Sequence, residues 1–192
     1  MRTRRFIAAA ASVAALASSV LLAPAANADA GRAAPSGHQK TTTVVLNPAL
    51  VPVLVNTLKV RALAPAQLTA PGGVAQVSFP ITDGEDGVIG HVGGLEFTPV
   101  GGGDLRVTNF DIHLATGLLD AKAQLNGKRL PGRVNLFALG APQPINGSLP
   151  ACSGTAAGLT LTAAAANALG APSFAGAFVG DACVVLPAGS GD

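Results

Sequence analysis

Imidazole side chains are the groups in this sequence best suited to bind a metal ion or a cofactor. His91 lies in a glycine-rich stretch ahead of an apolar segment, and His113 follows Asp111 on the polar side of another. Iron accepts imidazole readily, so His91 is the candidate cofactor ligand and His113 a second one. Lone histidines of β proteins are more often surface or hydrogen-bonded side chains, and the sequence alone favours this alternative.

Acidic side chains gather at Asp83, Glu85 and Asp86, beside Gly84 and Gly87. Calcium ions favour several such oxygens, but the spacing of an EF-hand loop is absent. Asp and Gly are also ordinary turn residues. We therefore predict a solvated turn over residues 82–87 and no metal site.

Basic side chains cluster at Lys122, Lys128, Arg129 and Arg133, around a predicted hairpin. Such a cluster is able to contact an anionic polymer of the cell surface. Charged residues at a hairpin tip also protect strand edges in soluble proteins. The second interpretation is the one that the pattern favours.

The sequence contains no motif for nucleophilic catalysis or phosphate binding. No serine stands in a nucleophile elbow, and Ser153 follows Cys152 in an ordinary turn. Gly101–Gly103 precede a predicted strand, so no helix N-terminus is available there to hold phosphate. We predict that the protein is not an enzyme.

The N-terminal segment has the pattern of a secretory signal peptide. Arg2, Arg4 and Arg5 precede an uncharged run from Phe6 to Asn27, which ends in the small-x-small site Ala26-Asn27-Ala28. An uncleaved membrane anchor is the alternative. Cleavage after Ala28 leaves 164 of 192 residues, with 9 basic and 10 acidic side chains. We expect a secreted or extracytoplasmic protein, free or associated with the cell wall, without a transmembrane segment or a nucleic-acid partner.

The two cysteines of the chain, Cys152 and Cys183, favour a disulfide in an exported protein. The bridge would close a loop of about 30 residues and stabilise the fold by roughly 3–4 kcal/mol in the chain-entropy model. A metal or redox pair is the alternative, but the sequence has no CxxC motif and no histidine near them.

The rest of the chain divides into a lead-in over residues 29–40, one β-rich domain over 41–187 and a tail over 188–192. Strands are expected at 41–46, 59–63, 74–81, 88–92, 95–100, 105–114, 119–125, 134–139, 159–162 and 174–186. Short helices are expected after the Asn47-Pro48 cap and over 163–169. The absence of Trp and Tyr argues against carbohydrate binding, which uses stacked rings.

Two local signals fix details of the predicted sheet. Leu105 and Val107 share one parity, whereas Phe110 and Ile112 share the other, so a β-bulge is expected near Asn109. Asn126-Gly127 follows an alternating segment and predicts a type I′ turn. Together the patterns predict an antiparallel β-sandwich with one or two short helices. The strand–helix–strand order near both ends suggests an internal repeat, or two similar corners of one sandwich.

The central stretch resembles the HtaA-type domain of secreted and cell-surface actinobacterial proteins. The residues that carry the resemblance lie in segments 90–97, 105–112 and 117–121, with a similar tail over 159–176, and the likeness covers about residues 80–160. It implies a β-sandwich-like secreted domain in a family where some members bind haem. Those members use a tyrosine ligand supported by histidine, whereas this chain has no tyrosine. Of the histidines, only His91 could match a histidine of that family, and it would need a different partner.

The sequence therefore predicts a secreted, non-enzymatic binding or structural module of the bacterial envelope, with an envelope component or protein as partner and no cofactor. One alternative is a relative of the HtaA-type domain that binds haem or another apolar ligand. A second alternative is an extracellular hydrolase without a readable motif.

Overall fold

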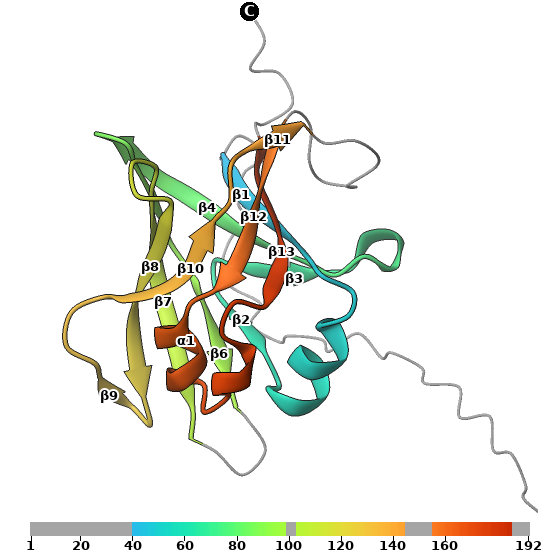
Figure 1. Ribbon diagram of the computed structural model, residues 1–192, viewed down its shortest axis with the longest axis vertical. Coiled ribbons are helices and arrows are strands. Elements are labelled where there is room, and N and C mark those ends of the chain that lie inside the picture. The colour runs from blue at the N-terminus through green and yellow to red at the C-terminus, as the bar shows by residue number, and fades with distance from the viewer. Residues whose placement is uncertain (1–39, 99–102, 145–154, 186–192) are drawn as a thin grey trace, which may run out of the picture. The chain divides into compact units, whose positions relative to one another are not determined.

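The computed structural model describes residues 40–98, 103–144 and 155–185. Thirteen strands dominate it (Figure 1). They are β1 (Thr41–Leu46), β2 (Arg61–Leu63), β3 (Gln67–Thr69), β4 (Gln76–Glu85), β5 (Val88–His91), β6 (Gly94–Phe97), β7 (Leu105–His113), β8 (Leu118–Leu125), β9 (Lys128–Arg129), β10 (Val134–Leu139), β11 (Gln143–Pro144), β12 (Thr155–Leu161) and β13 (Phe178–Val185). The helical segments are the π-helix η1 (Val53–Thr57), the 3-10 turns η2 (Pro71–Gly73) and η3 (Pro172–Phe174), and the α-helix α1 (Ala163–Ala168).

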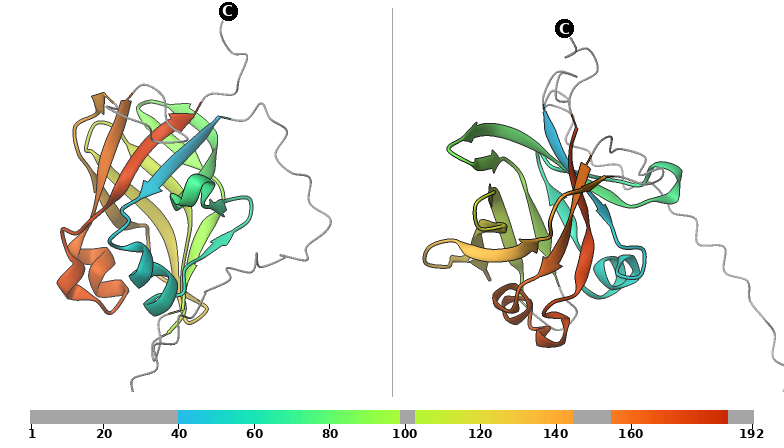
Figure 2. Two further views of the ribbon diagram at one scale, coloured as in Figure 1. Left: turned by 90° about the vertical axis from the view of Figure 1, so that its right-hand side faces the viewer. Right: turned by 45° about the horizontal axis from the view of Figure 1, so that its top comes forward.

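Eight of these strands close into an antiparallel barrel (Figures 1 and 2). The order around it is β7-β5-β4-β1-β13-β12-β10-β8, and β8 pairs with β7 to complete the ring. The mostly β class is confirmed, but the expected sandwich is wrong because the hydrogen-bonded ladder is continuous. Closure satisfies the backbone groups that the edges of two separate sheets would leave unpaired.

Strand β7 is the element on which the closure depends. It pairs with β8 on one side, and on the other side with β6 at its start and β5 at its end. The predicted bulge is confirmed, since the β7–β8 register shifts between Thr108 and Asp111 and Asn109 has a φ of 53°. The bulge lets Val107 and Phe110 both face the core although their parities differ.

The predicted Asn-Gly hairpin is also confirmed. Asn126 and Gly127 have φ angles of 50° and 75°, and the flanking pair is Leu125 with Lys128. By contrast, the wide turn expected over 82–87 is wrong. Strand β4 runs on to Glu85, and the chain reverses at Asp86 and Gly87, whose φ angles are 52° and 76°.

The helical segments η1, α1 and η3 lie at one end of the barrel (Figures 1 and 2). The predicted second helix is confirmed, because α1 begins after Thr162, whose Oγ1 accepts a hydrogen bond from the Ala165 amide. The first is π-helical, with the Leu58 amide donating to the Val53 carbonyl. Asn47 caps the turn before it by accepting from the Ala49 amide.

Inward-facing apolar side chains of the strands and of α1 form one core. Its most buried members are Val107, Ala121, Ala123, Leu159, Ala165 and Ala166. No helix in the described part of the chain is long and apolar enough to span a membrane. The predicted signal peptide, the lead-in up to residue 39, Cys152 and the C-terminal tail lie outside the described residues.

Candidate functional site

An apolar cavity of about 140 Å³ opens at the end of the barrel that carries the helical segments. Strands supply inward-facing side chains such as Leu95, Phe97 and Val107, and η1 supplies Val53 and Leu54. Thr57 is the sole lining residue that is not apolar among the residues described. A pocket of this character can hold an apolar ligand but offers no group for acid–base chemistry.

The cavity is covered on one side by η1 and the residues around it. None of the residues of η1 is buried, and Val55 on its outer side is 56% exposed. Hydrogen bonds from residue i+5 to residue i are rare in proteins and are frequent at functional sites. This segment is therefore an exposed wall of the cavity without a buried residue of its own.

His91 lies deeper in the barrel, on a second cavity of about 60 Å³. Its side chain is buried, with an exposed fraction of 4%. Beside it, the rings of Phe79 and Phe110 meet edge to face, with centroids 4.8 Å apart. The glycine-rich stretch around His91 thus belongs to the barrel wall and not to an exposed loop.

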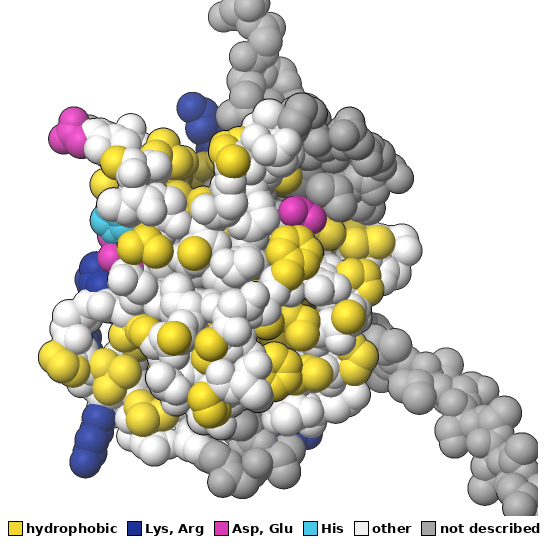
Figure 3. Space-filling view, in the orientation of Figure 1, with side chains coloured by type: hydrophobic (Ala, Val, Ile, Leu, Met, Phe, Trp, Pro, Cys, Tyr) yellow, Lys and Arg dark blue, Asp and Glu magenta, His cyan; other side chains and the backbone are white. Residues whose placement is uncertain are grey.

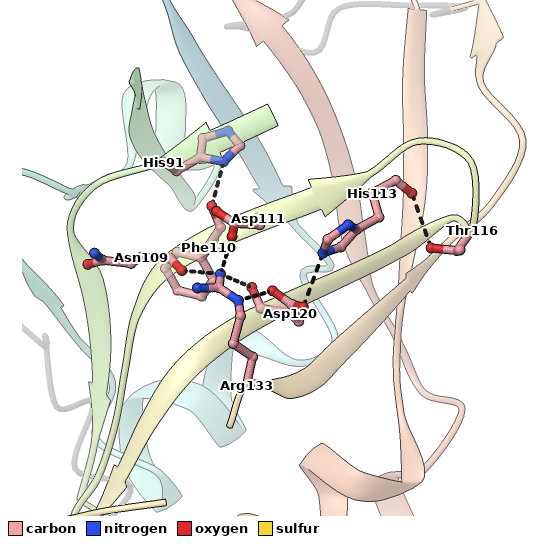
Figure 4. Close-up of polar contacts among 8 residues, drawn as sticks. All are labelled: His91, Asn109, Phe110, Asp111, His113, Thr116, Asp120 and Arg133. Atoms are coloured by element: carbon pink, nitrogen blue, oxygen red, sulfur yellow. Dashed lines mark hydrogen bonds and ion pairs between the residues drawn. The ribbon is translucent and has the colours of Figure 1, made fainter. Parts of the chain in front are cut away.

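Both ring nitrogens of His91 already have hydrogen-bond partners. Nε2 lies 2.6 Å from Oγ1 of Thr42. Nδ1 lies 3.2 Å from the carbonyl oxygen of Phe110 (Figure 4). A carbonyl oxygen only accepts, so Nδ1 carries a proton and donates. A metal bound at either nitrogen would have to displace one of these partners.

His113 belongs to a separate polar cluster on the outside of the barrel (Figure 4). Its Nε2 lies 3.1 Å from Oδ2 of Asp120. Arg133 pairs with Asp111 at 2.8 Å and with Oδ1 of Asp120 at 2.5 Å, and it donates to the Asn109 carbonyl at 2.6 Å. Arg133 thus binds the backbone of the bulge at Asn109 and the carboxylates of Asp111 and Asp120 beside it. These contacts hold the bulge of β7 in place.

The structure does not bring the four basic residues of the hairpin together. Arg133 turns to the acidic cluster, whereas Lys122 lies on the outer face of β8 and Arg129 on β9. All three of Lys122, Lys128 and Arg129 are exposed. Among the described residues, no group of three or more His, Cys, Asp or Glu side chains is arranged to hold a metal ion.

Cys183 is buried on β13, with an exposed fraction of 3%. Its predicted partner, Cys152, lies outside the described residues. The Cys152–Cys183 disulfide therefore stays a prediction. The side chains of Asp83 and Glu85 are likewise not described, so the structure does not test the calcium interpretation of that turn.

Sequence reasoning missed the apolar cavity. Its lining comes from residues between Leu46 and Val179, which no local pattern links. A signal was present, because the two short helical segments carry apolar residues on the side that faces the barrel. Only the closed barrel, however, shows which of these apolar residues line the cavity.

Comparison with known proteins gives a likeness of fold. No family model and no curated protein matches the chain. Among solved structures, the haem-binding protein HtaB from Corynebacterium glutamicum matches 78% of this chain and 93% of its own, with a TM-score of 0.56 at 12% identity. The C-terminal domain of HtaA from the same organism matches 77% of this chain and 96% of its own, with a TM-score of 0.47 at 15% identity. The resemblance expected from the sequence is thus confirmed for the fold, and the protein has the fold of an HtaA-type domain.

Proposed function

We propose that this protein is a non-enzymatic, extracytoplasmic module that binds an apolar ligand in the mouth of its barrel. The observation that carries the proposal is the apolar cavity between η1, α1 and the inward side chains of β6 and β7. Eight-stranded barrels are just wide enough to hold one small ligand when side chains do not fill them. Export rests on the N-terminal sequence pattern.

The size of the cavity limits the ligand. Its volume of about 140 Å³ is close to that of an engineered apolar cavity of roughly 150 Å³ that stays dry and binds benzene. It suits a single ring or a short stretch of alkyl chain. A longer ligand has room only if η1 moves outward, or if part of the ligand stays in solvent.

Haem is the alternative that the fold likeness offers, since HtaB is described as a haem-binding protein. The residues present do not fit that group. The chain has no tyrosine to serve as ligand, and both nitrogens of His91 are engaged inside the barrel. A porphyrin is also far larger than the benzene that a cavity of roughly this volume holds.

A haemin titration followed by absorbance tests this alternative. We expect no saturable, sharpened Soret band that depends on His91. A stoichiometric band in the parent chain, lost in a folded His91→Gln variant, would establish haem binding and overturn our assignment of the ligand class. Circular dichroism of the variant separates loss of the ligand from loss of the fold.

Binding of the apolar probe N-phenyl-1-naphthylamine, followed by fluorescence, tests the proposal itself. Leu54 lines the cavity, whereas its neighbour Val55 points outward from the same helix. Leu54→Asp places a charge on the apolar wall and should weaken probe binding at least about tenfold, because a charge is costly to bury. Val55→Asp adds the same charge to the same segment and should leave binding unchanged. Equal losses in the two variants, or no binding by the parent, would count against the cavity.

A further inference from the structure

Three arginines that are far apart in the sequence lie in a single row across the outside of the barrel. The cross-strand partners run from Arg61 on β2 to Glu96 on β6, then to Arg106 on β7, Gln124 on β8 and Arg129 on β9. We call these five residues the arginine row. Each residue of the row lies directly opposite the next one on the neighbouring strand, so the row crosses the strands at a right angle to their direction.

The side chains of the row point away from the core. Their strand neighbours Ala62, Leu95 and Ala123 pack against the core, and successive side chains of a strand face opposite sides. Arg61 and Arg129 are exposed, and the side chain of Arg106 is 54% exposed. Lys122 joins them from the next row, where it lies opposite Thr108.

Most of this positive charge has no acidic partner among the residues that the structure describes. Arg106 binds Glu96, with 2.6 Å between Nε and Oε1, and Glu96 is only 6% exposed. Across residues 40–98, 103–144 and 155–185, Arg61, Lys122 and Arg129 form no ion pair. Further along β7 and β8, Asp111 and Asp120 bind Arg133, and exposed Asp104 lies just before β7. Arg61, Lys122 and Arg129 thus remain as positive charges without an acidic partner among the described residues.

This face differs from the one over β10, β12 and β13. Figure 3 shows that hydrophobic and uncharged side chains predominate there, while Lys and Arg are seen at its margin. Five of the eight lysines and arginines in the described residues lie on the sheet β2-β6-β7-β8-β9. More than half of the described basic side chains thus belong to this one sheet.

The spacing within the row indicates what it binds. Adjacent strands are about 4.8 Å apart, so Arg61, Arg106 and Arg129, on alternate strands, stand about 10 Å apart over a row of about 19 Å. One small anion cannot reach all three, whereas an extended chain of phosphates can meet each in turn. Arginine binds phosphate oxygens through two parallel hydrogen bonds.

We propose that the arginine row, with Lys122, is a binding surface for a linear phosphate-containing polymer of the cell envelope. Single-stranded nucleic acid is disfavoured because no aromatic side chain in these rows can stack on a base. A bilayer is disfavoured because the rows offer no exposed apolar anchor. The site is separate from the cavity, so its occupancy does not depend on the apolar ligand.

Titration of the full chain with inorganic polyphosphate, followed by calorimetry at several salt concentrations, tests this surface. Arg61→Gln combined with Arg129→Gln removes two unpaired charges from the row and keeps the Arg106–Glu96 pair. Lys40→Gln combined with Lys59→Gln removes two exposed charges that lie outside the strands of the row and serves as the matched control. We expect the row variant to bind about tenfold more weakly and with a shallower salt dependence, and the control to bind like the parent.

Several results would overturn the proposal. Equal losses of polyphosphate affinity in the two double variants would mean that the net charge of the protein, and not the arginine row, determines binding. Competition by monophosphate at the same phosphate concentration would indicate a single-anion site. Tighter binding to vesicles of anionic phospholipid than to polyphosphate would mean that the surface binds lipid. Absence of polyphosphate binding by the parent protein would contradict the proposed binding surface.

Discussion

His91 and Thr42, which are 49 residues apart in the sequence, are joined by a hydrogen bond of 2.6 Å inside the barrel. The bond links β5 to β1 across the intervening strand β4. The second ring nitrogen binds the Phe110 carbonyl, so the imidazole also holds β7. One buried side chain thus connects three strands of the ring.

Replacing His91 should therefore destabilise the fold. His91→Ala removes both hydrogen bonds, leaves a buried carbonyl without this donor and opens a void. We expect the free energy of unfolding to fall by about 2–4 kcal/mol, measured by denaturant unfolding. His113→Ala is the control, because its partly exposed pair with Asp120 should contribute no more than about 1 kcal/mol. Similar losses for the two histidines would contradict the role given to His91.

The bulge of β7 gives a second prediction, at Asn109. Its φ of 53° is costly for a β-branched residue and costs glycine little. Asn109→Val should lower the free energy of unfolding by about 1–3 kcal/mol, whereas Asn109→Gly should leave it nearly unchanged. Thermal unfolding of both variants measures the difference, and a tolerated valine would mean that the bulge is not required.

Arg133 and Asp120 provide a third prediction, about coupling. The Arg133 side chain is 27% exposed and that of Asp120 is 14% exposed, so solvent screens the pair only in part. A double-mutant cycle with Arg133→Met and Asp120→Asn should give a coupling energy of about 0.5–3 kcal/mol. Lys122→Met with Asp120→Asn is a matched cycle without a direct ion pair and should give a coupling close to zero. Equal couplings in the two cycles would mean that the geometry of Arg133 is unimportant.

The predicted Cys152–Cys183 disulfide gives a fourth. Neither cysteine of the denatured, unreduced protein should react with a maleimide, and both should react after reduction. Reduction should lower the free energy of unfolding by roughly 3–4 kcal/mol in the chain-entropy model. Two reactive thiols before reduction would show that the pairing is wrong.

The sequence predicted most local features of the fold but not its closure. Parity along residues 105–112 located the bulge, and Asn126-Gly127 located the hairpin turn, because both signals are set by neighbouring residues. The barrel depends on β1 pairing with both β4 and β13, and on β7 pairing with β8. Alternating apolar residues serve a sandwich and a barrel equally well, so the pattern could not distinguish the two.

For the candidate sites, too, the sequence indicated single residues but not the contacts between distant parts of the chain. The sequence favoured a surface or hydrogen-bonded His91 but did not identify its partners, because the bonds of His91 to Thr42 and Phe110 require strands that meet only in the closed barrel. Arg61, Arg106 and Arg129 carry no common motif, and only strand pairing aligns them. Long-range pairing is the information that a local reading of the sequence lacks.

The proposed function requires an apolar ligand to enter the barrel beside η1. Methyl NMR spectra of the protein, recorded during titration with a short-chain alcohol such as hexanol, test it most directly. We predict that shifts concentrate on methyl groups that line the cavity, such as those of Leu54, Leu95 and Val107, while those of the exposed Val55 and Leu68 stay in place. Shifts confined to the outer methyl groups, or no saturable shift at all, would contradict the claim.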